Sequence, residues 1–214
     1  YNPYMSEGKK TVIYEICEQL TRLEGGSAGW IAPDVVFVSV GDGCIIGAVH
    51  KGLRDMLALG WIETMPRIVG IQAEGSAPLV NAWERGLGPL EMEPVDAHSV
   101  ADSIVAGLPR DRIKALRAVR ETGGAYLSVT DEEILNGIPA LAQGCGVFAE
   151  PAAAAAYAGL VKAVREGRVE SDERVVVLST GTGLKDIASV MASVEEEPAI
   201  VEPTLAKARE ILDA

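Results

Sequence analysis

Three short runs of β-branched and aliphatic residues predict strands at residues 35–38, 67–71 and 174–178. None of these runs alternates with polar residues, which is typical of strands buried on both faces of a parallel sheet. Stretches before, between and after them predict helices at 10–23, 45–59, 110–121, 131–142, 152–166, 184–194 and 203–214. Because strands and helices alternate, we expect an α/β three-layer sandwich, with helices on both faces of a mostly parallel sheet of about four strands.

Two local signals refine this pattern. Thr130 and Glu133 have the spacing of a capping box, which predicts a helix start at residue 131. Residues 86–109 contain several prolines and glycines and no clear periodicity, and we interpret them as an irregular excursion across the surface. No linker is evident, so residues 1–214 are expected to form part of a single large domain.

Composition narrows the class of protein. Hydrophobic residues make up 48% of the chain and aromatic residues only 5%, which predicts a globular protein with an aliphatic core. The formal net charge of −12 disfavours nucleic acid and anionic membranes as partners. Three widely spaced cysteines predict neither a disulfide framework nor a zinc site, and they favour a reducing cytoplasm. No metal site is expected, because neither histidine has a second ligand at metal spacing.

The segment 39–47 joins a predicted strand to a predicted helix through a glycine-rich turn. Gly41 and Gly43 permit positive φ angles, so successive backbone N–H groups can converge on one anion, assisted by the helix dipole. A phosphate site is therefore one interpretation, and an ordinary turn is the other. The candidate ligand-binding residues are Gly41, Asp42, Gly43, Cys44 and Ile45.

A second turn of the same layout follows the third predicted strand, at 179–183. Ligands bind at the carboxyl ends of parallel strands, so the two turns are expected to share one edge and one ligand. The hydroxyls of Ser179 and Thr180 suit a hydrogen bond to a heteroaromatic nitrogen. Glu150 ends an apolar stretch before Pro151, where a carboxylate should be paired or raised in pKa. The alternative for residues 179–183 is a turn that binds no ligand. The alternative for Glu150 is a helix-start carboxylate without a catalytic role.

These motifs occur in a particular order along the chain, at 2–11, 38–52, 69–78, 101–104, 150–152 and 179–186. In this order they resemble threonine synthase and its relatives among the pyridoxal-phosphate enzymes of fold type II. The resemblance implies a large domain like that of the tryptophan synthase β subunit, and pyridoxal 5'-phosphate as cofactor. It places the cofactor phosphate on 41–45, the Thr180 hydroxyl at the pyridine nitrogen and Glu150 near the ring edge.

The chain departs from the family pattern in several places. Met5 stands where many members carry an arginine that helps hold the substrate phosphate, and Asp42 and Cys44 replace more usual residues, which indicates a divergent subgroup. The family's Schiff-base lysine lies upstream of the segments matched here. None of the lysines considered has the corresponding context: Lys9, Lys10, Lys51, Lys114, Lys162 and Lys185.

We therefore expect the catalytic lysine to lie outside this chain, whose first residue is Tyr1 rather than Met. The chain would be the C-terminal, cofactor-binding portion of a larger enzyme, with the missing N-terminal portion as its partner. By itself it would be inactive, and its uncovered apolar face would make it a homodimer.

The function implied by the resemblance is that of a threonine synthase-like lyase in amino-acid biosynthesis. Such an enzyme carries out β/γ-replacement or elimination on an amino acid such as O-phosphohomoserine. A serine/threonine ammonia-lyase or another β-replacing synthase of the same fold is a second hypothesis, which Met5 favours. A non-catalytic binding or assembly module without the lysine domain is a third.

Overall fold

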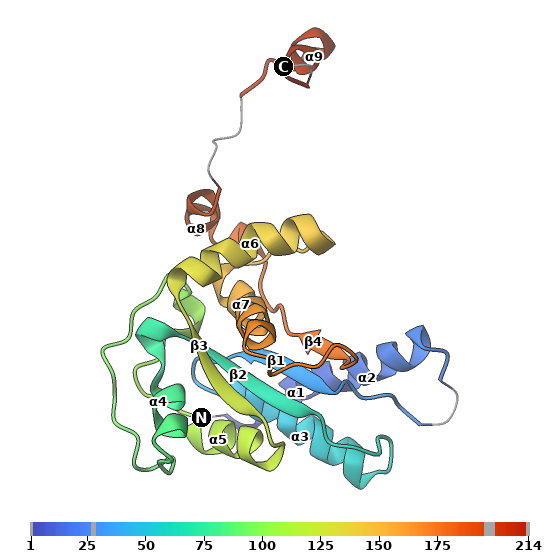
Figure 1. The fold of residues 1–214 in the computed structure, drawn as a ribbon, viewed down its shortest axis with the longest axis vertical. Coiled ribbons are helices and arrows are strands. Elements are labelled where there is room, and N and C mark those ends of the chain that lie inside the picture. Colours follow the sequence, from blue (N-terminus) through green and yellow to red (C-terminus); the bar gives the residue numbers. More distant parts are fainter. Residues whose placement is uncertain (1, 27–28, 195–199, 213–214) are drawn as a thin grey trace.

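The computed structural model describes residues 2–26, 29–194 and 200–212, and a parallel sheet crosses its body (Figure 1). The sheet has four strands in the order β3-β2-β1-β4. Parallel pairing places Phe37 opposite both Val69 and Val177. The expected α/β class with a four-stranded parallel sheet is thereby confirmed. The strands are β1 (Val35–Ser39), β2 (Arg67–Ala73), β3 (Ala125–Val129) and β4 (Val175–Val177).

Helices cover both faces of the sheet, as predicted (Figure 1). Helices α3 (Cys44–Ala58) and α5 (Arg112–Glu121) lie on one face, and α2 (Thr11–Leu23) packs behind α3. Helix α7 (Pro151–Arg165) lies on the other face with α6 (Asp131–Cys145) packed on it. The remaining helices are α1 (Pro3–Lys9), α4 (Pro78–Glu84), α8 (Ile187–Ala192) and α9 (Leu205–Leu212), with 3₁₀ turns at Glu74–Ser76, Asp102–Ile104 and Gly183–Lys185.

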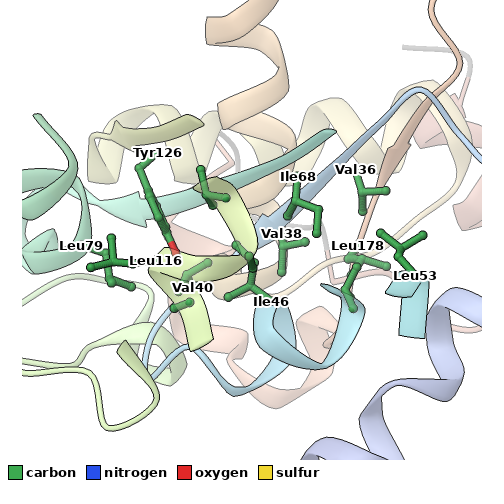
Figure 2. Close-up of a cluster of buried hydrophobic side chains, with 14 of the residues drawn as sticks. Val36, Val38, Val40, Ile46, Leu53, Ile68, Leu79, Leu116, Tyr126 and Leu178 are labelled. Atoms are coloured by element: carbon green, nitrogen blue, oxygen red, sulfur yellow. The ribbon is translucent and has the colours of Figure 1, made fainter. Parts of the chain in front are cut away.

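The core has two parts because β1 is buried on both of its faces. Val36 and Val38 pack toward α3, where they meet Ile46 (Figure 2). Val35 and Phe37, which alternate with them, belong to the cluster formed with α6 and α7. Side chains of both clusters are mainly aliphatic, as the composition predicts.

Helix α7 packs closely against the sheet through small residues. All five alanines of 152–156 are buried. At Gly159 a Cβ atom would lie 2.3 Å from Cδ1 of Ile71, so only glycine allows the helix this close to β2. The low-complexity alanine run is therefore a packing surface.

Helix α1 lies before the helix expected at 10–23, and the sequence pattern did not predict it. The side chain of Asn2 accepts the N–H of Tyr4 at 3.0 Å, which caps the helix. Pro3 occupies the first turn, where its missing N–H costs nothing. The same device, with Pro78 in the first turn, begins the unanticipated α4.

Strands β3 and β4 differ in detail from what the sequence predicted. The sequence did not locate β3, in which Ala125 and Ser128 are only partly buried and interrupt the apolar run. Strand β4 is limited to three half-buried residues, because it lies at the edge of the sheet and pairs with β1 alone among the described residues. The capping box is confirmed, since Thr130 and Glu133 each accept the other's backbone N–H.

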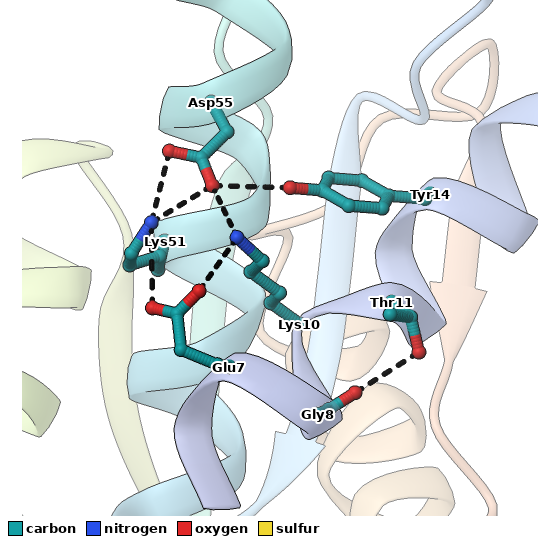
Figure 3. Close-up of polar contacts among 7 residues, drawn as sticks. All are labelled: Glu7, Gly8, Lys10, Thr11, Tyr14, Lys51 and Asp55. Atoms are coloured by element: carbon teal, nitrogen blue, oxygen red, sulfur yellow. Dashed lines mark hydrogen bonds and ion pairs between the residues drawn. The ribbon is translucent and has the colours of Figure 1, made fainter. Parts of the chain in front are cut away.

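A network of charged side chains fixes the N-terminal helices to α3 (Figure 3). Lys10 Nζ lies 2.7 Å from Glu7 and 2.9 Å from Asp55, and the hydroxyl of Tyr14 donates to Asp55 at 3.0 Å. Lys51, on α3, lies 2.8 Å from the same Asp55. We call these five residues the clasp. Burial acts to raise the pKa of Asp55, but the hydrogen bonds from Lys51, Lys10 and Tyr14 outweigh it and lower that pKa to about 2.

Replacing Asp55 with Asn should destabilise the fold, because two ammonium groups lose their common partner. The expected loss in free energy of unfolding at pH 7 is about 1 kcal/mol. Since the pKa of Asp55 falls on folding, its contribution is present above its ordinary value of 3.8 and disappears as the pH falls toward about 2. Urea unfolding at pH 7 and near pH 2.5 measures this difference, with Asp172→Asn at an exposed position as control. If Asp55→Asn lowers the free energy of unfolding by the same amount at both pH values, the assigned role of the Asp55 charge is wrong.

Candidate functional site

The two glycine-rich turns lie side by side at the carboxyl edge of the sheet. Strands β1 and β4 are parallel neighbours, and the N–H of Leu178 donates to the carbonyl of Phe37 at 3.0 Å. Residues 41–45 and 179–183 continue from these two strands at the same end. The prediction that both turns share one edge is therefore confirmed.

Gly41 and Gly43 are required by the geometry of the first turn. Gly43 is the N-cap of α3 and has a φ of 89°. A Cβ atom at Gly41 would lie 2.9 Å from Cα of Ile104, and one at Gly43 would lie 2.7 Å from Cβ of Ala115. The loop is thus held tightly between the 3₁₀ turn at 102–104 and α5, and it lines a hollow.

Several hydrogen-bond donors at this turn have no acceptor within the described chain. They include the backbone N–H groups of Gly41, Asp42 and Gly43. The first-turn N–H groups of α3 add further donors, because a helix leaves these without an internal acceptor. Ser39 Oγ is also without a partner, although the residue is only 9% exposed. Buried polar groups are normally satisfied, so this arrangement fits an anion with several oxygens, such as a phosphate.

Two adjoining hollows extend along this edge. The first, of about 240 Å³, is lined by the 41–45 loop and by Ser39. The second, of about 250 Å³, is lined by Leu178 and Thr180. Lys9 and Ile45 line both hollows. The candidate phosphate loop and Thr180 therefore line neighbouring hollows, and Lys9 at the end of α1 borders both.

Asp42 and Cys44, the unusual residues of the loop, have defined partners. The carboxylate of Asp42 accepts the N–H of Arg110 at 3.1 Å, and its carbonyl accepts the N–H of Asp111 at 2.9 Å. Cys44 Sγ lies 3.8 Å from the hydroxyl of Ser6, which in turn accepts from Lys114 Nζ at 2.8 Å. Both side chains thus tie the loop to neighbouring elements.

Glu150 is buried and paired, as its position in the sequence suggested. It is 6% exposed, and its carboxylate lies 2.8 Å from Lys185 Nζ, whose pKa it raises through this hydrogen bond. Its N–H donates to the carbonyl of Gly181 at 3.0 Å, and a Cβ atom at Gly181 would collide with the Glu150 carboxylate. Glu150 therefore fixes the shape of the second turn.

The structure thus gathers only some of the candidate residues around the hollows. Gly41, Asp42, Gly43, Cys44 and Ile45 line the first and Thr180 the second, whereas Glu150 and Ser179 line neither. Sequence reasoning did not nominate Ser39 or Lys9. Ser39 is the last residue of the fully buried strand β1, and a polar side chain in that position is the signal that could have identified it.

The described residues lack two other kinds of functional feature. No helix there is long and apolar enough to cross a membrane. Nor do those residues contain a group of three or more His, Cys, Asp or Glu that could hold a metal ion.

Comparison with known proteins gives a consistent result for the sequence. A family model described as pyridoxal-phosphate dependent enzyme matches residues 1–181. Threonine synthase of Methanosarcina acetivorans is 41% identical over 211 residues, which cover 99% of this chain and 50% of that protein. Threonine synthase of Methanocaldococcus jannaschii is 40% identical over 202 residues, 94% of this chain and 47% of that protein. The chain spans about half the length of these curated relatives.

Solved structures of the same fold include more distant proteins. An L-serine ammonia-lyase from Rhizomucor miehei superposes with a TM-score of 0.70 at 18% identity, covering 90% of this chain and 56% of that one. A threonine deaminase from Solanum lycopersicum superposes with a TM-score of 0.68, also at 18% identity, covering 89% of this chain and 49% of that one. The sequence motifs, the parallel sheet and the family match agree. The chain belongs to the pyridoxal-phosphate dependent enzymes of fold type II and is similar to threonine synthases.

Proposed function

We propose that the two hollows hold pyridoxal phosphate, with its phosphate on the 41–45 loop and its ring extending toward Thr180. The observation that carries this proposal is the set of unpartnered donors, the loop N–H groups and Ser39 Oγ, beside a hydroxyl-bearing turn on the same edge. Backbone donors with a helix N-terminus suit a phosphate, and the adjoining space suits a flat ring. When bound, the cofactor supplies an electron sink for chemistry on an amino acid.

In this proposal each part of the site has a separate task. The loop N–H groups and Ser39 bind and orient the phosphate. The Thr180 hydroxyl offers the ring nitrogen a neutral hydrogen bond, which leaves that nitrogen without an added proton and moderates the electron sink. Glu150, locked to Lys185, holds the turn that carries Thr180. Ser179 is exposed beside Thr180 and lines neither hollow, so it contributes through the shape of the turn.

For the whole protein we propose a threonine synthase-like activity, β/γ-replacement or elimination on an amino acid such as O-phosphohomoserine. Support comes from relatives named threonine synthase at 40–41% identity. An ammonia-lyase or β-replacing activity is the second candidate, favoured by Met5 at the position where the family often has arginine. The Schiff-base lysine would come from outside residues 1–214, and a homodimer and a cytoplasmic location remain predictions.

Replacing Gly43 with Val should abolish cofactor binding, because a side chain there meets Ala115 and is strained at a φ of 89°. The affinity of the chain for pyridoxal phosphate, measured by calorimetry, should fall at least about tenfold, as expected for lost charge-assisted hydrogen bonds. Gly60→Val is a matched control, since Gly60 has a φ of 69° at the other end of α3 and no neighbour within 4 Å.

Ser39→Ala tests the same site without backbone strain and guards against a Gly43 variant that fails to fold. It should weaken binding several-fold through loss of a single hydrogen bond. Wild-type affinity in both Gly43→Val and Ser39→Ala would contradict the proposed cofactor site.

The chain alone should bind the cofactor without a covalent link, since the family's lysine has no counterpart among its matched segments. After equimolar pyridoxal phosphate and reduction with borohydride, the intact mass of the protein should be unchanged. Peptide mapping distinguishes scattered labelling from a specific product. A stoichiometric adduct on one lysine would refute this prediction and identify the catalytic amine.

A further inference from the structure

Lys9, the last residue of α1, lies where the two hollows meet. It lines the first together with the 41–45 loop and the second together with Thr180. Met5, one helical turn earlier on the same face of α1, also lines the first hollow. Of these two residues that α1 directs toward the loop, only the half-buried Lys9 carries a charge.

Lys9 is a cation without a partner in the part of the chain that the structure describes. No hydrogen bond or ion pair engages it there. Its neighbour Lys10 is held by Glu7 and Asp55 in the clasp, on the side of α1 that faces α3 (Figure 3). Glu7 also lies 3.5 Å from Lys51, so this nearby carboxylate is already shared between two other ammonium groups.

The acidic residue that lines the first hollow is also engaged elsewhere, and the second hollow is lined by one further acid, Glu15. Asp42 lines the first hollow, but its carboxylate accepts the N–H of Arg110. The clasp meanwhile fixes α1 against α3, so Lys9 is kept over the loop. An ammonium group, several N–H groups and the Ser39 hydroxyl therefore surround one space with no internal anion assigned to it.

We propose that Lys9 is the charge partner of a phosphate dianion in this space, a specificity-determining residue that supplements the backbone donors of the 41–45 loop. The inference rests on the proposed cofactor site. A phosphate fits better than a carboxylate, because it offers three terminal oxygens and two negative charges to a set of donors larger than a carboxylate can use. The phosphate belongs either to the cofactor or to a phosphorylated amino-acid substrate.

Calorimetry on Lys9→Gln tests the proposal with three probes: inorganic phosphate, pyridoxal phosphate, and pyridoxal without its phosphate. Affinity for inorganic phosphate should fall roughly tenfold, the loss typical of one partly exposed charge-assisted hydrogen bond, and affinity for pyridoxal should not change. Affinity for pyridoxal phosphate should fall to the same extent if the cofactor phosphate is the partner of Lys9. Lys9→Arg should restore most of the affinity. Lys207→Gln, the same change at an exposed residue of α9, should match wild type.

A fourth titration separates the two sources of phosphate. A phosphonate analogue of a phosphorylated amino acid is added to protein saturated with pyridoxal phosphate. If Lys9→Gln weakens only this step, the substrate phosphate is the partner of Lys9; if it weakens only the binding of pyridoxal phosphate, the cofactor phosphate is. Either result supports the charge-partner role.

The outcome that overturns the role of Lys9 is wild-type affinity of Lys9→Gln in all titrations while Gly43→Val loses binding. The proposed cofactor site would stand in that case. If wild-type protein binds none of the phosphate-bearing probes, the cofactor site fails and the inference about Lys9 fails with it.

Discussion

The pairing of β1 with β4 is the interaction on which the candidate site depends. It joins residues near the start of the chain to residues near its end, through the register of Phe37 with Val177. Only this pairing brings the turn after β4 beside the glycine loop that leads into α3. Because β1 is buried on both faces, its position is fixed by packing from α3 on one side and α7 on the other. The packing of the core therefore determines where the two turns of the candidate site lie.

The sequence predicted the parts of the fold whose burial is uniform. Strands β1 and β2 are apolar along their length and buried, so their residues reveal them directly. Strand β3 was not located because Ala125 and Ser128 are partly exposed, and β4 is less buried than its Val run suggested because it is an edge strand. Helix α1 begins with a cap from Asn2 and with Pro3 in its first turn, but at seven residues it is too short to show a helical period in the sequence.

The glycine loop could be predicted because a strand, a GxG turn and a helix follow one another along the chain. The same pattern marks Ser39 only as a polar residue at the end of a buried strand, and it does not distinguish Lys9 from Lys10. Ser39 Oγ lacks a hydrogen-bond partner because of how the sheet edge packs, which the sequence does not show. Lys9 has no ion-pair partner among the described residues because the clasp engages its neighbour Lys10 instead. For a chain with a formal net charge of −12, such short-range donors are what would allow an anion to bind at all.

The alanines of α7 have a further consequence, for the entropy of folding. A buried alanine loses no side-chain rotamers, so burying these five orders only the backbone of the helix. Because alanine side chains are small, they interlock little with the sheet and offer little resistance to a shift of α7 along its own axis. The close fit of Ile71 against Gly159 supplies resistance of this kind between α7 and β2.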